Sequence, residues 1–190
     1  QVCTTPSFGE EIEWGAVVAH GDVRVFNQVD TVLRSPEEAQ GTLRGAMREL
    51  GAPLDAACAL ALVRWQPALE INAAMGWATG FPERTYRRLL DEVAALPAEV
   101  LVPSAGGLRH HSPYAGMNDI VYPLDEGRFR RDLARRCPEA RVLGDTTGDV
   151  LVVTPDAVKR EPSPLAEVTS RPPPPVFLPH RGLPPLRDPD

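Results

Sequence analysis

Residues 58–65 read CALALVRW, an apolar run that is interrupted only near its end, by Arg64. A continuous apolar run of this length is typical of a strand buried on both faces of a parallel sheet. Residues 82–96 predict a helix, and its apolar side chains fall on one face: Tyr86, Leu89, Leu90, Val93 and Leu96. Residues 99–102 predict the next strand. Two strands joined by a helix predict a βαβ unit with adjacent parallel strands, so the fold class is α/β.

Upstream of this unit, residues 12–19 and 23–29 predict two strands of a hairpin. The residues between them, His20-Gly21-Asp22, favour a tight turn. A helix is expected from Ser35, because serine is a good N-cap and proline follows at the first helical position. Glu38 completes a capping box, and the helix is expected to end at Gly51.

Downstream, residues 125–136 predict a third helix, and residues 141–143 and 149–153 predict two short strands. Two loops separate the clear elements. One, residues 66–80, is polar and contains two glycines, and the other, residues 104–118, is rich in glycine. Loops of this length are often functional.

Prolines divide the chain into two parts. Of the 21 prolines in the sequence, eleven lie from Pro155 onward, including the run at 172–175. Such a run lacks backbone donors and favours polyproline II. We therefore expect one domain over residues 1–154 and an extended tail or linker over residues 155–190, with a disordered linker or a ligand of a proline-binding domain as alternatives for the tail.

Composition excludes several classes of protein. The 190 residues contain 20 Lys and Arg against 26 Asp and Glu, a net charge of -6, which argues against wrapping of duplex nucleic acid. No apolar run approaches the roughly 20 residues that span a bilayer. The three cysteines are widely spaced and form neither a CxxC zinc pattern nor an even disulfide set. We expect no nucleic acid, no membrane and a reducing, cytoplasmic setting.

Asp30 is the first candidate for chemistry. It follows a predicted hairpin strand directly, in the sequence Asn27-Gln28-Val29-Asp30. An acidic residue at the carboxyl edge of a strand is well placed to face a metal or a ligand. The alternative is that its carboxylate caps the turn that follows.

His110 and His111 are the next candidates. They are adjacent in a loop, so their side chains are expected to point apart, and one of them is expected to join Asp30 as a metal ligand. Imidazole with carboxylate suits zinc, iron or manganese. The alternative is a solvated pair, which the neighbouring Arg109 favours. Arg109 is itself a candidate partner for an organic anion, or else an ordinary surface charge.

Trp77 and Ser104 are candidates because of their loops. Trp77 lies in the loop at 66–80, and Ser104 opens the loop at 104–118. If both loops line one pocket, these two side chains and Arg109 contact the substrate. No GxSxG elbow is present and Ser104 has no obvious neighbouring base, so a serine hydrolase is not supported.

The order of three motifs resembles a known family. They are VFNQVDTVL at 25–33, GWATGFPERTYRRLLDEVAALPAEVLVPSAGGLRHHSPY at 76–114, and GDTTGDVLVV at 144–153. Together they are similar to the C-terminal half of metallo-β-lactamase-fold hydrolases, in the branch that includes UlaG-like hydrolases and CMP-N-acetylneuraminate hydroxylases. The resemblance covers about residues 12–154.

This resemblance implies a four-layer αββα sandwich with one or two metal ions at its centre. In such proteins the metal lowers the pKa of a bound water and makes it a nucleophile. Asp30 matches the position of the bridging carboxylate, and His110 or His111 lies a few residues beyond the loop that often supplies a late ligand. Zinc is expected in the complete site, with iron or manganese as alternatives.

The HxHxDH motif that supplies most ligands in this family is absent from the chain. We therefore expect half a sandwich with exposed apolar faces, completed by a missing N-terminal half or a second subunit. Three explanations are open: the chain is a piece of a longer protein, one subunit of a split enzyme, or a degenerate relative that no longer binds metal. We expect one of the first two, because the chain begins at Gln1 without an initiator Met. The predicted function is part of a metal-dependent hydrolase acting on a small organic anion. The alternatives are an iron-dependent or Rieske-associated oxygenase of the same fold, and a metal-free binding or scaffold module.

Overall fold

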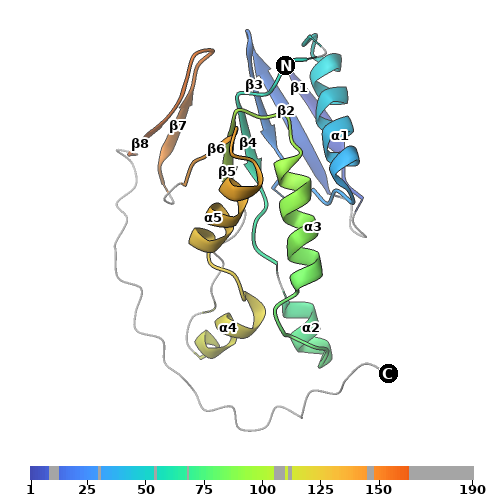
Figure 1. Cartoon of the computed structure of the whole chain (residues 1–190), viewed down its shortest axis with the longest axis vertical. Helices are drawn as coiled ribbons and strands as arrows, with labels where there is room; N and C mark the ends of the chain where they lie inside the picture. Colours follow the sequence, from blue (N-terminus) through green and yellow to red (C-terminus); the bar gives the residue numbers. More distant parts are fainter. Residues whose placement is uncertain are drawn as a thin grey trace.

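The computed structural model describes residues 1–8, 13–29, 31–53, 55–67, 69–104, 110, 113–144 and 148–162. The fold is α/β, as predicted, with a six-stranded sheet in the order β1-β2-β3-β4-β5-β6 and a separate two-stranded sheet, β7-β8 (Figure 1). The strands are β1 (Val2–Pro6), β2 (Trp14–His20), β3 (Val23–Asn27), β4 (Leu60–Val63), β5 (Val100–Pro103), β6 (Arg141–Val142), β7 (Val150–Val153) and β8 (Val158–Glu161).

The large sheet is mixed. Its first three strands are antiparallel, and β3 to β6 run parallel. The predicted βαβ unit is confirmed, because β4 and β5 are parallel neighbours with Ala61 opposite Leu101, and α3 (Glu83–Ala94) connects them. The predicted hairpin is confirmed as well, and Gly21 adopts a positive φ of 56° in its turn.

The remaining helices are α1 (Pro36–Glu49), α2 (Glu70–Met75), α4 (Asn118–Val121) and α5 (Glu126–Arg136), with a 3-10 turn η1 (Ala115–Met117). Ser35 caps α1 as predicted, since its hydroxyl accepts the N–H of Glu38 at 3.2 Å. The reciprocal bond differs by one residue. The Glu38 carboxylate accepts the N–H of Arg34 at 2.7 Å instead of the N–H of Ser35.

Short elements account for the differences from the sequence prediction. Strand β1 was not expected, α2 lies in the predicted loop 66–80, and η1 and the start of α4 lie in the predicted loop 104–118. Strand β8 lies inside the segment assigned to the tail, so the folded part continues past residue 154. Strand β1 (VCTTP) has no apolar run, and α2, η1 and α4 have six residues or fewer, less than two helical turns, so a helical period does not show in their sequences.

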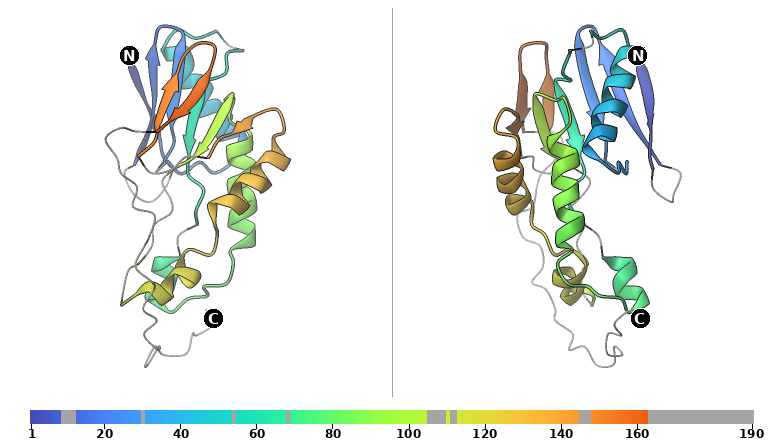
Figure 2. Two further views of the ribbon diagram at one scale, coloured as in Figure 1. Left: turned by 90° about the vertical axis from the view of Figure 1, so that its left-hand side faces the viewer. Right: turned by 45° about the vertical axis from the view of Figure 1, so that its right-hand side comes forward.

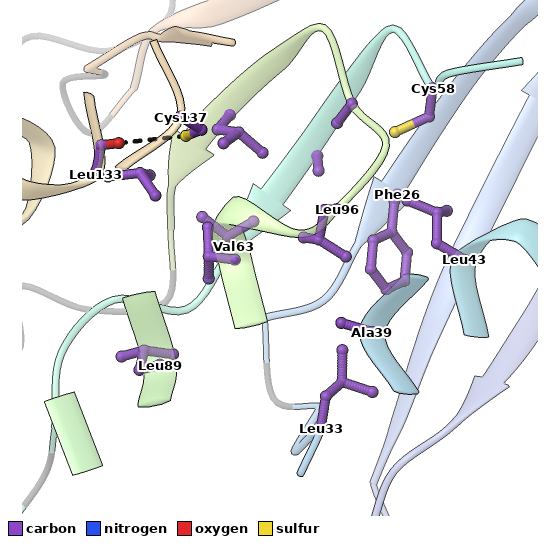
Figure 3. Packing of buried hydrophobic residues seen from close by; sticks show 14 of the residues in the cluster. Phe26, Leu33, Ala39, Leu43, Cys58, Val63, Leu89, Leu96, Leu133 and Cys137 are labelled. Atoms are coloured by element: carbon purple, nitrogen blue, oxygen red, sulfur yellow. Dashed lines mark hydrogen bonds between the residues drawn. The ribbon is translucent and has the colours of Figure 1, made fainter. Parts of the chain in front are cut away.

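Two layers cover the large sheet unequally. Helices α1, α3 and α5 cover one face, and the β7-β8 hairpin lies against the other face (Figure 2). The helix-facing core includes Phe26, Leu43 and Val63, each fully buried (Figure 3). The second cluster joins Leu60, Val100 and Val102 of the sheet to Val158 of β8. The hairpin thus forms the beginning of a second layer.

The β1-β2 part of the sheet lacks this second layer in the described structure. Along β2, Gly15, Val17 and Ala19 are buried toward the helices, while Trp14 and Val18 on the other face are 70% and 45% exposed. Val2 of β1, which lies opposite Val18 across the ladder, is 65% exposed. The expectation of an exposed apolar face is therefore confirmed, and we call this surface, made of Val2, Trp14 and Val18, the open face.

All three cysteines are free thiols. Cys58 and Cys137 are buried on the helix side of the sheet, where the Cys137 thiol donates to the Leu133 carbonyl at 3.2 Å (Figure 3). Within the described ranges, no helix is long and apolar enough to cross a membrane. Residues 163–190, most of the predicted tail, lie outside the described residues.

Candidate functional site

The two loops that the sequence singled out meet beyond the carboxyl ends of β4 and β5. Helices α2 and α4 lie together at this end of the molecule, away from the sheet (Figures 1 and 2). The N–H of Leu69, just before α2, donates to the carbonyl of Val121 at the end of α4, at 2.8 Å. Ligands of open α/β folds bind outside the carboxyl ends of strands, so this is the first place to look for a site.

His110 is fixed here by its backbone. Its N–H donates to the Asn118 Oδ1 at 2.7 Å, and the Asn118 Nδ2 donates back to the His110 carbonyl at 3.0 Å. Asn118 is the first residue of α4. One amide side chain therefore ties the His110 backbone to the start of α4.

The His110 ring belongs to a polar cluster from three segments. The ring stacks on Tyr122, with centroids 5.6 Å apart, and its Nε2 lies 3.2 Å from Oε1 of Glu70. The Tyr122 hydroxyl donates to the same Oε1 at 2.5 Å. We call this arrangement the Glu70–His110–Tyr122 cluster. It is partly open to solvent, since the side chains of His110 and Glu70 are 32% and 47% exposed.

Glu70 serves its two partners differently. Tyr122 makes a directed hydrogen bond to Glu70, whereas His110 Nε2 is buried and lies at ion-pair distance without hydrogen-bond alignment. Burial, and then the bond to Glu70, raise the pKa of Tyr122 to about 12, so the phenol stays protonated at neutral pH. An imidazole nitrogen beside a carboxylate can exchange a proton, or the two groups can offer N and O donors to a cation.

The described residues do not fit a complete metal site. No group of three His, Cys, Asp or Glu side chains gathers anywhere in the described ranges. Glu70 and His110 are two donors, and a catalytic zinc site takes three protein ligands. Any metal at this end of the sheet needs ligands from beyond the described residues.

The other predicted site residues have mixed outcomes. Asp30, Arg109 and His111 lie outside the described residues, so their roles stay predictions. Trp77 follows the left-handed Gly76 that ends α2, is 46% exposed, and donates its N–H to the Asn72 carbonyl. Ser104 directly follows β5 and donates its N–H to the Val63 carbonyl at 2.7 Å.

The sequence prediction missed Glu70, Asn118 and Tyr122. Glu70 and Asn118 are ordinary polar residues in segments expected to be loops, and Tyr122 lies between the predicted loop 104–118 and the predicted helix 125–136. Glu70 lies 40 positions before His110 in the numbering. The one available signal is that both loops follow adjacent parallel strands, whose carboxyl ends meet at the same edge of the sheet.

A second polar cluster is buried under β2. Oγ1 of Thr5 and Oγ1 of Thr31 lie 2.4 and 2.6 Å from the position a Cβ on Gly15 would take, so only glycine fits there. Both hydroxyls, and both polar atoms of the Gln28 side chain, are buried without a hydrogen-bond partner among the described residues. Buried polar groups are normally satisfied, which makes this cluster unusual.

A groove of about 450 Å³ between α3 and α5 is lined by charged side chains. Its arginines already have acidic partners: Arg136 pairs with Asp91, and Arg128 with Asp132. Such neutralised pairs indicate a solvated contact between two helices, so we place the candidate site at the Glu70–His110–Tyr122 cluster.

Comparison with models of protein families found no match, and comparison with curated proteins found none either. One solved structure, a mutant of the CmlA beta-hydroxylase, is similar to 76% of this chain, at 14% sequence identity and a TM-score of 0.43. The chain spans 29% of the length of that protein. The fold class stated above therefore rests on the strand order and packing of the chain itself.

Proposed function

We propose that this chain is one half of a metal-dependent hydrolase whose other half, with the HxHxDH ligands, comes from a second segment or subunit. The observation that carries the proposal is the open face. A row of exposed apolar side chains, Val2, Trp14 and Val18, lies on the sheet face where β7-β8 has begun a second layer. Contiguous exposed apolar surface on a protein commonly marks an interaction site.

The Glu70–His110–Tyr122 cluster supports the same proposal. The cluster lies beyond the carboxyl ends of the parallel strands. Glu70 and His110 come from the two loops that the sequence assigned to the substrate pocket, and Tyr122 follows shortly after the second loop. In the proposed enzyme, Asp30 and His110 or His111 are this half's contribution to the metal site. Arg109, Trp77 and Ser104 line the pocket for a small organic anion.

The chain alone offers too few donors for tight metal binding, because affinity depends on the number of ligands held in place. The proposal therefore predicts that the isolated chain binds no stoichiometric metal and that the complete assembly does. Intact mass and metal content of the natively purified protein, prepared without chelator, test this directly.

Three results are distinguishable. A second chain or a longer polypeptide with one or two metal ions supports the proposal, and iron in place of zinc favours the oxygenase alternative. A lone folded species of 20.7 kDa without metal overturns both enzymes and leaves a binding or scaffold module. In the assembly, Asp30→Ala and His110→Ala are expected to lower metal content, while His20→Ala, in the hairpin, is the matched control.

A further inference from the structure

The two edges of the large sheet differ in how they are protected. At one edge, β6 has only two residues, and the Arg141 guanidinium donates to the Val158 carbonyl of β8. At the other edge, β1 has five residues and β2 is its one strand neighbour among the described strands. The edge beyond β1 is therefore the longer and the less covered of the two.

The hydrogen bonds of the β1-β2 ladder show which backbone groups face outward. Gln1 and Ala19 exchange both backbone bonds, each at 2.9 Å. Bonded pairs alternate along an antiparallel ladder, so Cys3 and Thr5 also bond toward β2. The N–H and C=O groups of Val2 and Thr4 then point to the free edge.

The sequence of β1 has none of the usual features that prevent an edge strand from pairing with another strand. Natural proteins block exposed edges with charged side chains, prolines, bulges or very short strands. Strand β1 (VCTTP) carries no charge, and its proline comes last, at Pro6. Strand β2 (WGAVVAH) carries no acidic, lysine or arginine side chain. The edge is also continuous with the open face, because Val2 and Thr4 lie opposite Val18 and Ala16.

We propose that β1 is the docking edge for an extended strand of the missing half, uncharged toward the open face, which pairs with Val2 and Thr4 and extends the six-stranded sheet. This inference rests on the proposed function, and it specifies how the second half attaches. Every second side chain of the docked strand points to the open face. Since β1 and β2 carry no acidic, lysine or arginine side chain, a charged side chain at those positions would lose its water without gaining a partner when the second half covers the face, so we expect these positions to be uncharged. Backbone bonds at the edge then fix the register, and apolar contacts on the open face add binding energy.

Amide hydrogen exchange of the full chain, alone and in the natively purified assembly, tests the proposal. In the isolated chain, the Val2 and Thr4 amides are expected to exchange fast, and the Cys3 and Thr5 amides slowly. In the assembly, the Val2 and Thr4 amides are expected to slow by at least about 100-fold, as for amides in a paired strand.

A pair of variants at Thr4 separates the edge from the face. Thr4→Pro removes an N–H that the β1-β2 ladder does not use, and prolines are tolerated on edge strands, so Cys3 and Thr5 should keep their protection. Thr4→Val keeps the N–H and the shape of the side chain. We expect Thr4→Pro to weaken assembly about tenfold or more, and Thr4→Val to leave it within about twofold, since one lost backbone bond leaves its partner unsatisfied.

The remaining outcomes overturn the proposal. An assembly that forms and binds metal while Val2 and Thr4 stay unprotected would reject the edge contact and leave the proposed function intact. Absence of any assembly would reject both. Protection that rises with concentration of the chain alone would show that a second copy occupies the edge. Protection in the isolated chain that is independent of concentration would show that a segment of the same chain does.

Discussion

The β4-β5 half and the β1-β2 half of the large sheet have similarly apolar strands, but the sheet face opposite the helices is buried in the first half and exposed in the second. In β4 and β5, Leu60 and Val102 face β7-β8 and are 2% and 0% exposed. In β2, Val18 faces the same side and is 45% exposed, although its neighbour Val17 is fully buried against the helices. The difference lies in the covering layer, which β7-β8 supplies to one half of the sheet only.

This contrast separates two contributions to stability. The helix layer and the β7-β8 contact are internal, so the chain has them whether or not a partner is present. The open face gains nothing until another segment covers it, because apolar surface stabilises only when it leaves water. Substitutions in the two halves should therefore differ in whether they affect the chain or its assembly.

Two tryptophans provide the largest expected effect. Trp65 is 5% exposed and its ring lies 6.3 Å from that of Phe129, whereas Trp14 on the open face is 70% exposed. Trp65→Ala should lower the free energy of unfolding by about 3–5 kcal/mol, through lost packing and a residual cavity. Trp14→Ala should change it by less than about 0.5 kcal/mol, as is usual for exposed positions. Urea unfolding of the isolated chain measures both.

The Trp14 variant, which should hardly change the stability of the isolated chain, should have its effect in the assembly. There, Trp14→Ala is expected to weaken association, because a large aromatic side chain loses its contact with the second half. Equal losses of stability for the two variants in the isolated chain would show that Trp14 is already covered, and the contrast between the halves would fail.

The next largest change in the free energy of unfolding is expected at a buried ion pair beside β4, in the half of the sheet that β7-β8 covers. Glu92 of α3 is fully buried, and its carboxylate lies 3.1 Å from Nη2 of Arg64 and 3.3 Å from Nε of Arg88. Glu92→Ala leaves Arg64 partly buried without its acid and should cost about 3 kcal/mol. The exposed pair Arg87–Glu83 is the matched control, and Arg87→Ala should cost less than about 0.5 kcal/mol in the same unfolding experiment.

Glu92 also predicts a pH dependence. Burial raises the pKa of its carboxyl, and the nearby Arg64 and Arg88 offset only part of that. The unfolded chain then releases this proton at a lower pH than the folded chain, so stability falls as the pH rises from about 4 through the raised pKa. Glu92→Gln should remove this part of the pH profile. Parallel profiles for wild type and Glu92→Gln would contradict the raised pKa.

The long elements of the fold were predictable because local signals and burial agreed. The 58–65 run, the one-sided pattern of 82–96 and the Ser35 cap each match an observed element within about two residues at either end. Strands β1 (VCTTP) and β8 (VKRE) were missed although strands as short as β5 were predicted, because neither has the apolar run that marks a buried strand. Strand β8 additionally lies between Pro155 and Pro162, which favoured a tail.

The candidate site was less predictable than the fold. His110 was singled out because it adjoins His111, but its partner Glu70 comes from another loop. Which loop residues meet depends on how α2 and α4 pack, and α2 has no buried residue from which a helical face could be recognised. The sequence could locate the edge of the sheet where loops converge, but not the contacts between them.

A substitution of Gln28, just after β3, should change the free energy of unfolding less than those of Trp65 and Glu92, and should increase it. Its side chain is fully buried, and both polar atoms lack a partner among the described residues. Gln28→Leu removes two unsatisfied groups at similar volume and should raise stability by about 1 kcal/mol. The exposed neighbour Asn27 provides the control. Asn27→Asp keeps the Oδ1 that accepts the Val29 N–H at 3.1 Å and should have little effect. Destabilisation by Gln28→Leu would show instead that the amide holds a buried water or another group.

The smallest expected change in stability is at the Glu70–His110–Tyr122 cluster. Glu70 is 47% exposed, so Glu70→Gln should alter the free energy of unfolding by less than about 0.5 kcal/mol. The pKa of Tyr122, about 12, should nevertheless fall, because the carboxylate that accepts its proton is lost. It should fall only part of the way to the ordinary value, since burial is the larger cause and remains. Absorbance titration of tyrosinate measures this, with Tyr122→Phe to assign the signal. An unchanged pKa would mean that Glu70 does not bond to Tyr122 in solution, and His110 would then be free to use the carboxylate alone.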